Sequence, residues 1–209
     1  MLKIEHLTKS YGEVKAVDDL SLHINPGEIY GFIGHNGAGK TTTLKAVAGI
    51  HGFDSGEIFI GGISIKDKPI EAKRKMAYIP DNPDLYDYMT GIKYLNFVAD
   101  IFGIGPERAD RIKKYAAAFE IENNLNSAIS SYSHGMKQKL ALISALIHEP
   151  QLILMDEPFV GLDPKAAHTL KTIMHDICAS GGAIFFSTHV LEVAEKLCDK
   201  VAVIKGGHL

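Results

Sequence analysis

The chain opens on segments in which apolar and polar residues alternate. Residues 2–8, LKIEHLT, and residues 14–24, VKAVDDLSLHI, place apolar side chains at roughly every second position. That period is typical of strands with one buried face. Two further alternating runs in residues 56–65, GEIFIGGISI, meet at Gly61 and Gly62 and predict a hairpin. We therefore expect an antiparallel β-rich start.

Helical patterns fill the middle of the chain. Residues 28–34, EIYGFIG, form a short apolar run that leads through glycines into the helix-forming residues 41–50, a strand–loop–helix order.

From about residue 81 to 150 the spacing predicts helices over residues 90–102, 106–119 and 134–149, with Pro106 in a first turn. This stretch is expected to be a helical subdomain.

The last third alternates between strand and helix patterns. Predicted strands at residues 152–155, 183–188 and 200–204 are separated by predicted helices at residues 164–180 and 190–198. Continuously apolar strands in such an order are typical of a parallel sheet covered on both faces. The fold class is therefore α/β, with a mixed, mainly parallel core sheet, an N-terminal antiparallel β subdomain and an inserted α-helical subdomain.

Composition narrows the class of protein. The 209 residues are 46% hydrophobic and 22% charged, with a formal net charge of -3, which excludes disorder and disfavours nucleic acid as a partner. Cys178 and Cys198 have neither metal-site nor redox-pair spacing and suit a reducing cytoplasm. The charged start does not resemble a signal peptide, and the apolar run at 140–147 is too short to span a bilayer. Residues 206–209 resemble a hairpin turn without its return strand, so we expect the natural chain to continue past Leu209.

Residues 34–41, GHNGAGKT, fit the pattern GxxxxGK[ST] between a predicted strand and a predicted helix. Glycines let backbone N–H groups turn toward phosphate oxygens, and a helix N-terminus adds positive potential. Lys40 is expected to reach the β- and γ-phosphates, and the Thr41 hydroxyl to bind Mg²⁺. A glycine-rich turn that merely caps a helix is the weaker interpretation. The expected nucleotide-binding residues of this segment are Gly34, Asn36, Gly37, Ala38, Gly39, Lys40, Thr41 and Thr42.

Two adjacent carboxylates follow the apolar strand in residues 152–158, LILMDEP. The carboxyl ends of strands are where α/β sheets bind ligands. Neighbouring side chains on an extended chain point to opposite sides, so we expect Asp156 to hold Mg²⁺ and Glu157 to polarise the attacking water. Taken alone, Asp-Glu-Pro fits a helix cap as well as it fits a catalytic pair. Only the nearby phosphate loop favours the catalytic interpretation.

Together these segments resemble the ATP-binding subunit of ATP-binding cassette (ABC) transporters over essentially the whole chain. Residues 132–139, YSHGMKQK, resemble the LSGGQ signature of that family and keep Ser133 and Gly135, whereas Tyr132, His134 and Met136 depart from its commonest form. The resemblance implies that this helix N-terminus meets ATP held by a second subunit. Taken alone, the segment is an ordinary helix cap.

Three further positions match the family, and a fourth matches it imperfectly. The resemblance implies that Tyr11 stacks on adenine, that Asp163 in FVGLDP communicates across a dimer, and that His189 hydrogen-bonds the γ-phosphate. Asp81 in YIPDNP stands where glutamine is usual, and we expect it near the metal. Each of the first three would more often be structural if it stood alone.

Large apolar residues gather downstream of Asp81. The resemblance implies a groove here that docks a helix of a membrane permease. The set is Leu85, Tyr86, Tyr88, Met89, Tyr94, Phe97 and Phe102. Helical spacing makes Tyr94, Phe97 and Phe102 core residues in our interpretation, which leaves Tyr86 and Tyr88 as the docking candidates.

Three functional classes share the phosphate loop. A small-molecule phosphotransferase leaves the signature segment, FVGLDP and His189 unexplained, and nucleic-acid ATPases of this superfamily need long insertions or paired cassettes. The favoured hypothesis is an ATPase, catalysed by Glu157, His189 and Lys40, that binds ATP and Mg²⁺ at Thr41, Asp156 and Asp81. It is expected to be one ABC ATPase domain over residues 1–209, with the core in 1–82 and 151–209 and the helical subdomain in 83–150. Its expected partners are a second ATP-binding subunit and a permease, expected to be an exporter, that holds it at the inner face of the cell membrane.

Overall fold

The structure, a computed structural model, describes all residues from 1 to 209. The chain forms two compact units. The first comprises Met1–Pro80, Pro150–Pro158 and Met174–Leu209, and the second Asp81–Glu149 and Phe159–Ile173. The sequence pattern assigned residues 83–150 to the helical subdomain, whereas the second unit also takes in residues 159–173.

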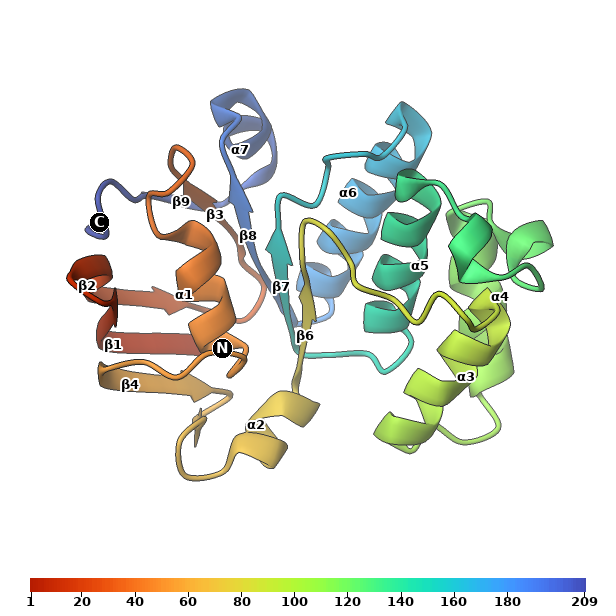
Figure 1. Cartoon of the computed structure of the whole chain (residues 1–209), viewed down its shortest axis with the longest axis horizontal. Coiled ribbons are helices and arrows are strands. Elements are labelled where there is room, and N and C mark those ends of the chain that lie inside the picture. Colours follow the sequence, from red (N-terminus) through yellow and green to blue (C-terminus); the bar gives the residue numbers. More distant parts are fainter. The chain divides into compact units, whose positions relative to one another are not determined.

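A five-stranded parallel sheet is the frame of the first unit (Figure 1). Its strands lie in the order β6-β7-β8-β3-β9. They are β6 (Met76–Ile79), β7 (Leu152–Asp156), β8 (Ala183–Thr188), β3 (Ile29–Ile33) and β9 (Lys200–Val203). Because all five strands run the same way, the segments that follow β3, β7 and β8 leave the sheet at one edge. The predicted α/β class is confirmed, and the core sheet, expected to be mixed but mainly parallel, is parallel in all five strands.

The inner strands β3, β7 and β8 are mainly apolar because both of their faces are covered, whereas the edge strand β9 is largely exposed. Phe32 on β3 packs in the main core with Leu44 of helix α1 (Lys40–Val47). Its neighbour Gly31 faces the other way, since a Cβ there would lie 3.5 Å from Cβ of Ala194 in helix α7 (Leu191–Leu197). Successive residues of one strand therefore meet different helices on opposite faces.

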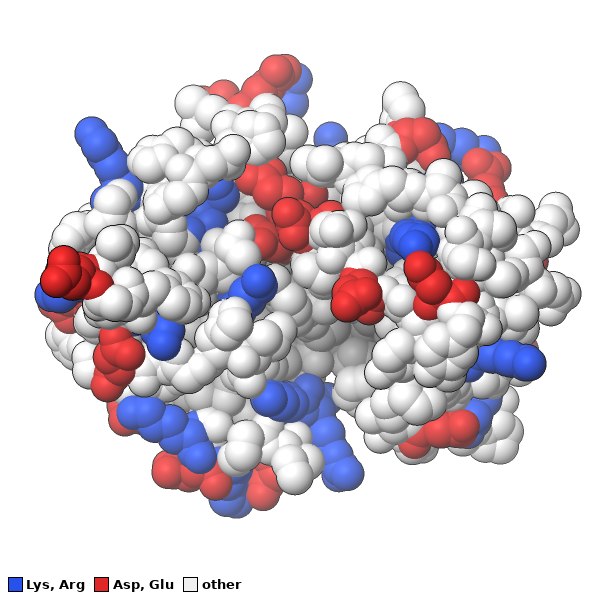
Figure 2. Space-filling view, in the orientation of Figure 1, with Lys and Arg blue, Asp and Glu red and all other residues white.

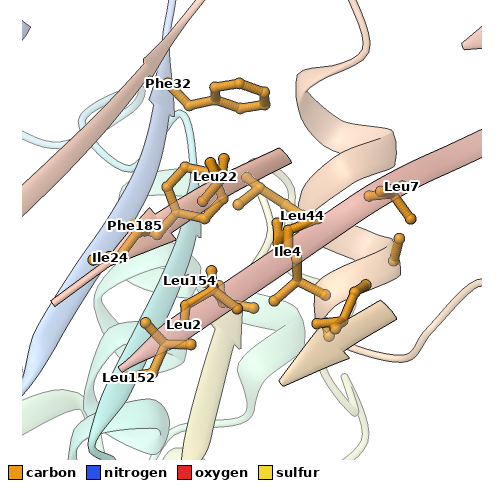
Figure 3. Packing of buried hydrophobic residues seen from close by; sticks show 14 of the residues in the cluster. Leu2, Ile4, Leu7, Leu22, Ile24, Phe32, Leu44, Leu152, Leu154 and Phe185 are labelled. Carbon is orange, nitrogen blue, oxygen red and sulfur yellow. The ribbon is translucent and has the colours of Figure 1, made fainter. Parts of the chain in front are cut away.

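A second, antiparallel sheet packs on the α1 side (Figure 3). Its strands lie in the order β2-β1-β4-β5. They are β1 (Leu2–Tyr11), β2 (Val14–Ile24), β4 (Ser55–Ile60) and β5 (Ile63–Ser64). Figure 3 shows Leu2 and Ile4 of β1 beside Leu44 and Leu154, so the two sheets and α1 share one core. The predicted hairpin at Gly61 is present.

The alternation along β1 and β2 is interrupted once in each strand. Buried Ile4 and Leu7 are three positions apart, and the register between the strands shifts at this point. His6 and Asp19 take positive φ angles of 52° and 53°, and their side chains meet at 2.7 Å between Nδ1 and Oδ1. These features form a β-bulge. The extra residue returns the apolar side chains to the buried face after the alternation is interrupted.

Helices dominate the second unit. They are α3 (Gly91–Phe102), α4 (Arg108–Ala118) and α5 (His134–Leu146), with short 3₁₀ turns at Glu122–Asn124 and Ile129–Ser131. Helix α6 (Pro164–Ala179) begins in this unit and ends in the first. Thr90 caps α3, with its hydroxyl accepting a hydrogen bond from the N–H of Lys93, and Gly103 ends the helix at a φ of 67°. The chain has no helix with both the length and the hydropathy needed to cross a membrane.

Three local expectations need correction. Pro106 precedes α4, which starts at Arg108 after Glu107, so it is not in the first turn. The short elements β6 and α2 (Pro69–Arg74) were missed, because four and six residues are too few to show a period. Phe97 and Phe102, expected in the core, are 38% and 36% exposed.

Charged side chains of both signs lie close together over much of the face in Figure 2. Exposed ion pairs of the chain include Lys66 with Glu57 at 2.9 Å and Lys68 with Glu71 at 3.2 Å. Exposed pairs of this kind contribute little to stability.

Glu28, directly before β3, accepts several hydrogen bonds at the start of the sheet. Burial of its carboxyl opposes ionisation, but hydrogen bonds from Asn25 and from Lys200 at 2.6 Å outweigh this effect and lower the pKa of Glu28 to about 2. The pair with Lys200 links the starts of β3 and β9.

We expect Glu28→Gln to lower the free energy of unfolding at pH 7 by about 1–3 kcal/mol. The native pKa lies below the unfolded value of about 4.3, so this stabilisation is present above that pH and is lost as pH falls toward 2. Urea unfolding at several pH values should show the gap between the two proteins closing in this range. Glu195→Gln, at an exposed glutamate, is the control. A difference in unfolding free energy that does not depend on pH would contradict the lowered pKa of Glu28.

Candidate functional site

The loop between β3 and α1 is shaped by its glycines. Gly37 and Gly39 take φ angles of 81° and 112°, which favour glycine. A Cβ on Gly39 would collide with the carbonyl oxygen of Ala16, and one on Gly34 would lie 2.6 Å from the carbonyl oxygen of Ile204. Nothing lies within 4 Å of a Cβ on Gly37. The loop is thus packed against the protein at two glycines and open at the third.

Lys40 is the first residue of α1 and is only 5% exposed. Its ammonium donates hydrogen bonds to the carbonyls of Gly34 at 2.6 Å and His35 at 3.2 Å, and lies 3.7 Å from Oε1 of Glu157. The loop therefore curls around its own lysine at a helix N-terminus. A cation and free helix amides together form an anion-binding site.

The carboxylate of Asp156 is buried at the end of β7, with 1% of the residue exposed. The hydroxyl of Thr41 donates to Oδ2 at 2.6 Å, and the hydroxyl of Ser187 donates to Oδ1 at 2.5 Å. A hydroxyl and a carboxylate oxygen in contact are hard donors of the kind that Mg²⁺ prefers. The donor set at Thr41 and Asp156 therefore fits a magnesium ion.

The sequence patterns did not identify Ser187 as a site residue. It is fully buried in β8 and pairs with Asp156 in the register of the two strands. It also accepts a hydrogen bond from the N–H of Glu157 at 3.1 Å. A serine at the carboxyl end of the otherwise apolar run AIFF was the available signal.

Glu157 does not continue the strand. Its φ of 47° turns the chain just before Pro158, so the expectation of two side chains alternating on an extended backbone is wrong in its geometry. Such a conformation in a non-glycine residue costs about 1–3 kcal/mol and is typical of functional sites. The turn brings Oε2 within 3.0 Å of Nδ1 of His189 and leaves Oε1 buried without a hydrogen bond, near Lys40.

The other predicted residues of the first unit lie on or near the loop. Ala38 is buried and its N–H donates to the carbonyl of His35, Asn36 is exposed, and Thr42 is half-buried in α1. Tyr11, at the end of β1, is 49% exposed. Its ring meets the edge of His51, with centroids 6.5 Å apart, a neighbour that the sequence did not indicate.

The remaining predicted residues belong to the second unit. Ser133 is exposed and caps α5, its hydroxyl accepting from the N–H of Met136 at 3.3 Å. Asp163 caps α6 by accepting from the N–H of Ala166 at 2.8 Å. The Asp81 carboxylate is exposed and accepts from the N–H of Asn82.

Asp163 also pairs with Lys139, whose Nζ lies 2.7 Å from Oδ2. The hydrogen bond from Lys139, followed by that from the N–H of Ala166, lowers the pKa of Asp163. Within its own chain, Asp163 is therefore both a helix cap and an ion-pair partner. The structure thus brings Lys40, Asp156, Glu157 and His189 together in the first unit, whereas the roles of Ser133, Gly135, Asp163 and Asp81 at a nucleotide stay predictions.

A glycine loop at a helix N-terminus, a buried lysine and a hydroxyl–carboxylate pair at the ends of parallel strands define a P-loop nucleotide-binding protein. Comparison with known families is more specific: residues 17–160 match the ABC transporter family model. The chain therefore belongs to the ABC transporter family, as an ATP-binding, ATP-hydrolysing subunit. This confirms the family resemblance seen in the sequence.

Known proteins of this family match the chain along its length. An uncharacterised ABC transporter ATP-binding protein of Methanocaldococcus jannaschii is 36% identical over 99% of this chain and 74% of its own length. The Nod factor export ATP-binding protein I of Rhizobium etli is 34% identical over 96% of this chain and 64% of its own length. A solved structure of an ATP-binding subunit of an ABC transporter matches with a TM-score of 0.96 and 36% identity, covering 100% of this chain and 88% of that one.

The two positive-φ glycines of the loop give a matched test of its packing. Alanine at either position costs about 1 kcal/mol because of the left-handed backbone. Only at Gly39 does a backbone carbonyl occupy the Cβ position, so we expect Gly39→Ala to lose about 1–3 kcal/mol more than Gly37→Ala in urea unfolding without nucleotide. Equal losses would mean that the contact with Ala16 does not constrain the loop.

Proposed function

We propose that this chain powers substrate transport through a separate membrane permease by binding and hydrolysing ATP·Mg²⁺ between two ATP-binding subunits. The observation that carries the proposal is the placement of the Glu157 carboxylate between the ammonium of Lys40 and the imidazole of His189. A base, a cation and a hydrogen-bonding partner thus meet at the mouth of a phosphate-binding loop. This is the set that hydrolysis of a terminal phosphate requires.

The loop would bind the triphosphate through backbone amides of residues 34–42 and through Lys40. In the structure the Lys40 ammonium donates to carbonyls of its own loop. Phosphate oxygens carry more negative charge than carbonyls and would take over these hydrogen bonds. Lys40 is thus held close to where it acts.

Thr41 and Asp156 would hold Mg²⁺, which would neutralise charge on the phosphates. Asp81 is proposed as a neighbour of this ion, since its exposed carboxylate is a further oxygen donor. Ser187 keeps Asp156 oriented by its hydrogen bond to Oδ1. The side-chain pair of Thr41 and Asp156 is therefore preassembled around an oxygen-ligand site.

Glu157 would orient and deprotonate the attacking water. Its buried Oε1 accepts no hydrogen bond in the structure and so retains the capacity to accept one from water. His189 would hold the carboxylate through Oε2 and hydrogen-bond the γ-phosphate. The fixed backbone turn at Glu157 supports such a role because it orients the side chain without a flexible loop.

The second half of each site would come from a partner copy or a homologous chain. Ser133 and Gly135 stand at the N-terminus of the thirteen-residue helix α5, where amides and helix dipole favour an anion. Asp163 would contact the partner next to them, and the exposed ring of Tyr11 would stack on the adenine. In this proposal residues 1–209 act as one ATPase domain, with the core in 1–82 and 151–209 and the signature carried by 83–150.

The permease would dock on the exposed aromatic cluster of the second unit, formed by Tyr86, Tyr88 and Phe97. Tyr88 is 81% and Tyr86 44% exposed, and the Tyr86 ring contacts both Tyr88 and Phe97 with centroids within 5.8 Å. Exposed aromatic groups of this kind mark sites that bind a helix. Docking there would place the chain at the inner face of the cell membrane.

Export is the proposed direction of transport. The relatives include the Nod factor export protein and the linearmycin resistance ATP-binding protein of Bacillus subtilis, which is 32% identical over 100% of this chain. These names support a role in moving a substrate out of the cell. The direction can be measured with vesicles that contain the co-purified permease. ATP-driven uptake into empty vesicles is compared with ATP-driven efflux from loaded ones.

Replacing the base tests the chemistry. We expect Glu157→Gln to retain ATP binding but to lower kcat by at least about a hundredfold, because the amide cannot accept the proton of the attacking water. With hydrolysis blocked, ATP should shift the variant to a dimer on size exclusion. Asp176→Asn, at an exposed carboxylate on α6, is the control. Hydrolysis at the parental rate would remove Glu157 from this role.

Docking is tested with the double variant Tyr86→Ala, Tyr88→Ala. We expect it to bind ATP as the parent does and to lose at least about tenfold in affinity for its permease, because two exposed rings leave the interface. Co-purification and titration of the detergent-solubilised permease measure this. Ile70→Ala, at an apolar side chain 70% exposed in the first unit, should bind normally. Undiminished capture of the permease by the double variant contradicts the docking site.

A further inference from the structure

The ring of His134, an exposed residue, lies beside Gly161 in another segment of the second unit. It is the first residue of α5, directly after the capping Ser133. A Cβ on Gly161 would lie 2.5 Å from Cδ2 and 2.9 Å from Nε2 of His134. Gly161 has a φ of 80°, in the loop of residues 159–163 between Pro158 and α6. The imidazole thus occupies the space that any side chain at position 161 would need.

Gly135 makes a second close approach to the same glycine. A Cβ on Gly135 would lie 2.7 Å from the carbonyl oxygen of Gly161, and this neighbour is backbone that cannot swing away. The sequence pattern assigned Gly135 a role toward phosphate only. The structure adds a reason within the chain for glycine at this position: the carbonyl of the 159–163 loop lies where a side chain would begin.

A third contact ties the far end of this loop to α5. Lys139, one and a half turns after His134, pairs with Asp163 at 2.7 Å, and its side chain is 13% exposed. Asp163 in turn caps α6 through the N–H of Ala166. The start of α5 therefore meets the loop twice. His134 and Gly135 approach Gly161, and Lys139 pairs with Asp163, so only Leu162 separates the two contact points on the loop.

We propose that His134 is a positioning residue, whose ring locks residues 159–163 onto the tip of α5 so that Ser133 and Asp163 move as one rigid element. This inference rests on the proposed function, in which both residues face the nucleotide site of a second subunit. A small residue at position 134 leaves the loop held at Gly161 only by the approach of Gly135. The loop then samples more conformations, and closure of the dimer must order it again.

A double-mutant cycle between positions 134 and 161 tests the packing. The variants are His134→Ala, Gly161→Ala and the two combined, each made with and without Glu157→Gln. The strain of alanine at a positive φ is the same with either residue at position 134, so it cancels in the cycle. What remains is the collision between the new Cβ and the imidazole.

We expect His134→Ala to raise the dissociation constant of the ATP-bound Glu157→Gln dimer about tenfold and to lower kcat by a similar factor, whereas ATP affinity of the monomer is unchanged. Gly161→Ala should weaken the dimer at least about tenfold when His134 is present, and less than about threefold when it is combined with His134→Ala. Equal factors in both backgrounds overturn the proposal.

Two further variants separate ring packing from other effects. His134→Asn keeps planar atoms where Nδ1 and Cδ2 of the ring lie and should recover at least half of the lost dimer affinity. Loss equal to that of His134→Ala overturns the packing role. His168→Ala, at an exposed histidine on α6, is the matched control and should leave dimer and kcat unchanged.

Hydrogen exchange of the ATP-free protein distinguishes failure of this inference from failure of the proposed function. If His134 locks the loop, amides of residues 160–163 exchange at least about tenfold faster in His134→Ala, while amides in β7 are unchanged. Faster exchange without any ATP-dependent dimer in Glu157→Gln contradicts the proposed function alone. Unchanged exchange overturns the role of His134, whether or not the dimer forms.

Discussion

The site depends on one buried carboxylate. Asp156 ends β7 with almost no exposed surface, and it is tolerated there because Thr41 and Ser187 donate to its two oxygens. Thr41 belongs to the helix after β3 and Ser187 to β8, so this carboxylate ties three segments at one edge of the sheet. Loss of either hydroxyl would leave a carboxylate oxygen buried without its hydrogen bond, and this would lower the stability of the fold.

From that anchor the reacting groups follow in sequence and in space. Glu157 comes next in the chain, and its left-handed turn, fixed by the N–H bond to Ser187, aims its carboxylate at Lys40 and His189. The side chain of Lys40 folds back over the glycine loop, where its ammonium donates hydrogen bonds to two carbonyls of the loop. Ser187 thus serves both acidic residues, since it hydrogen-bonds the side chain of Asp156 and the backbone of Glu157.

The second unit uses helix caps for the same purpose. Ser133 caps α5 and Asp163 caps α6, which is the ordinary structural role that each segment suggested on its own. In the structure both capping residues are exposed at the tips of their helices, so the structural and functional interpretations are compatible. Tyr132, a departure from the usual signature, is explained as well: it is buried, and its hydroxyl donates to the carbonyl of Asn124 at 2.6 Å. His134 supplies packing on Gly161 where a glycine would supply none.

The sequence by itself determined the α/β class, most elements and the phosphate loop, because these depend on local period and on glycines at fixed spacing. It also placed Asp156 and Glu157 at a strand end. Tertiary structure alone decided that Ser187 completes this group, that Glu157 turns away from the strand, and that the Phe97 ring joins Tyr86 on the surface. Residues 156 and 187, or 134 and 161, are far apart in the chain, and no local pattern records which distant backbone a side chain will meet.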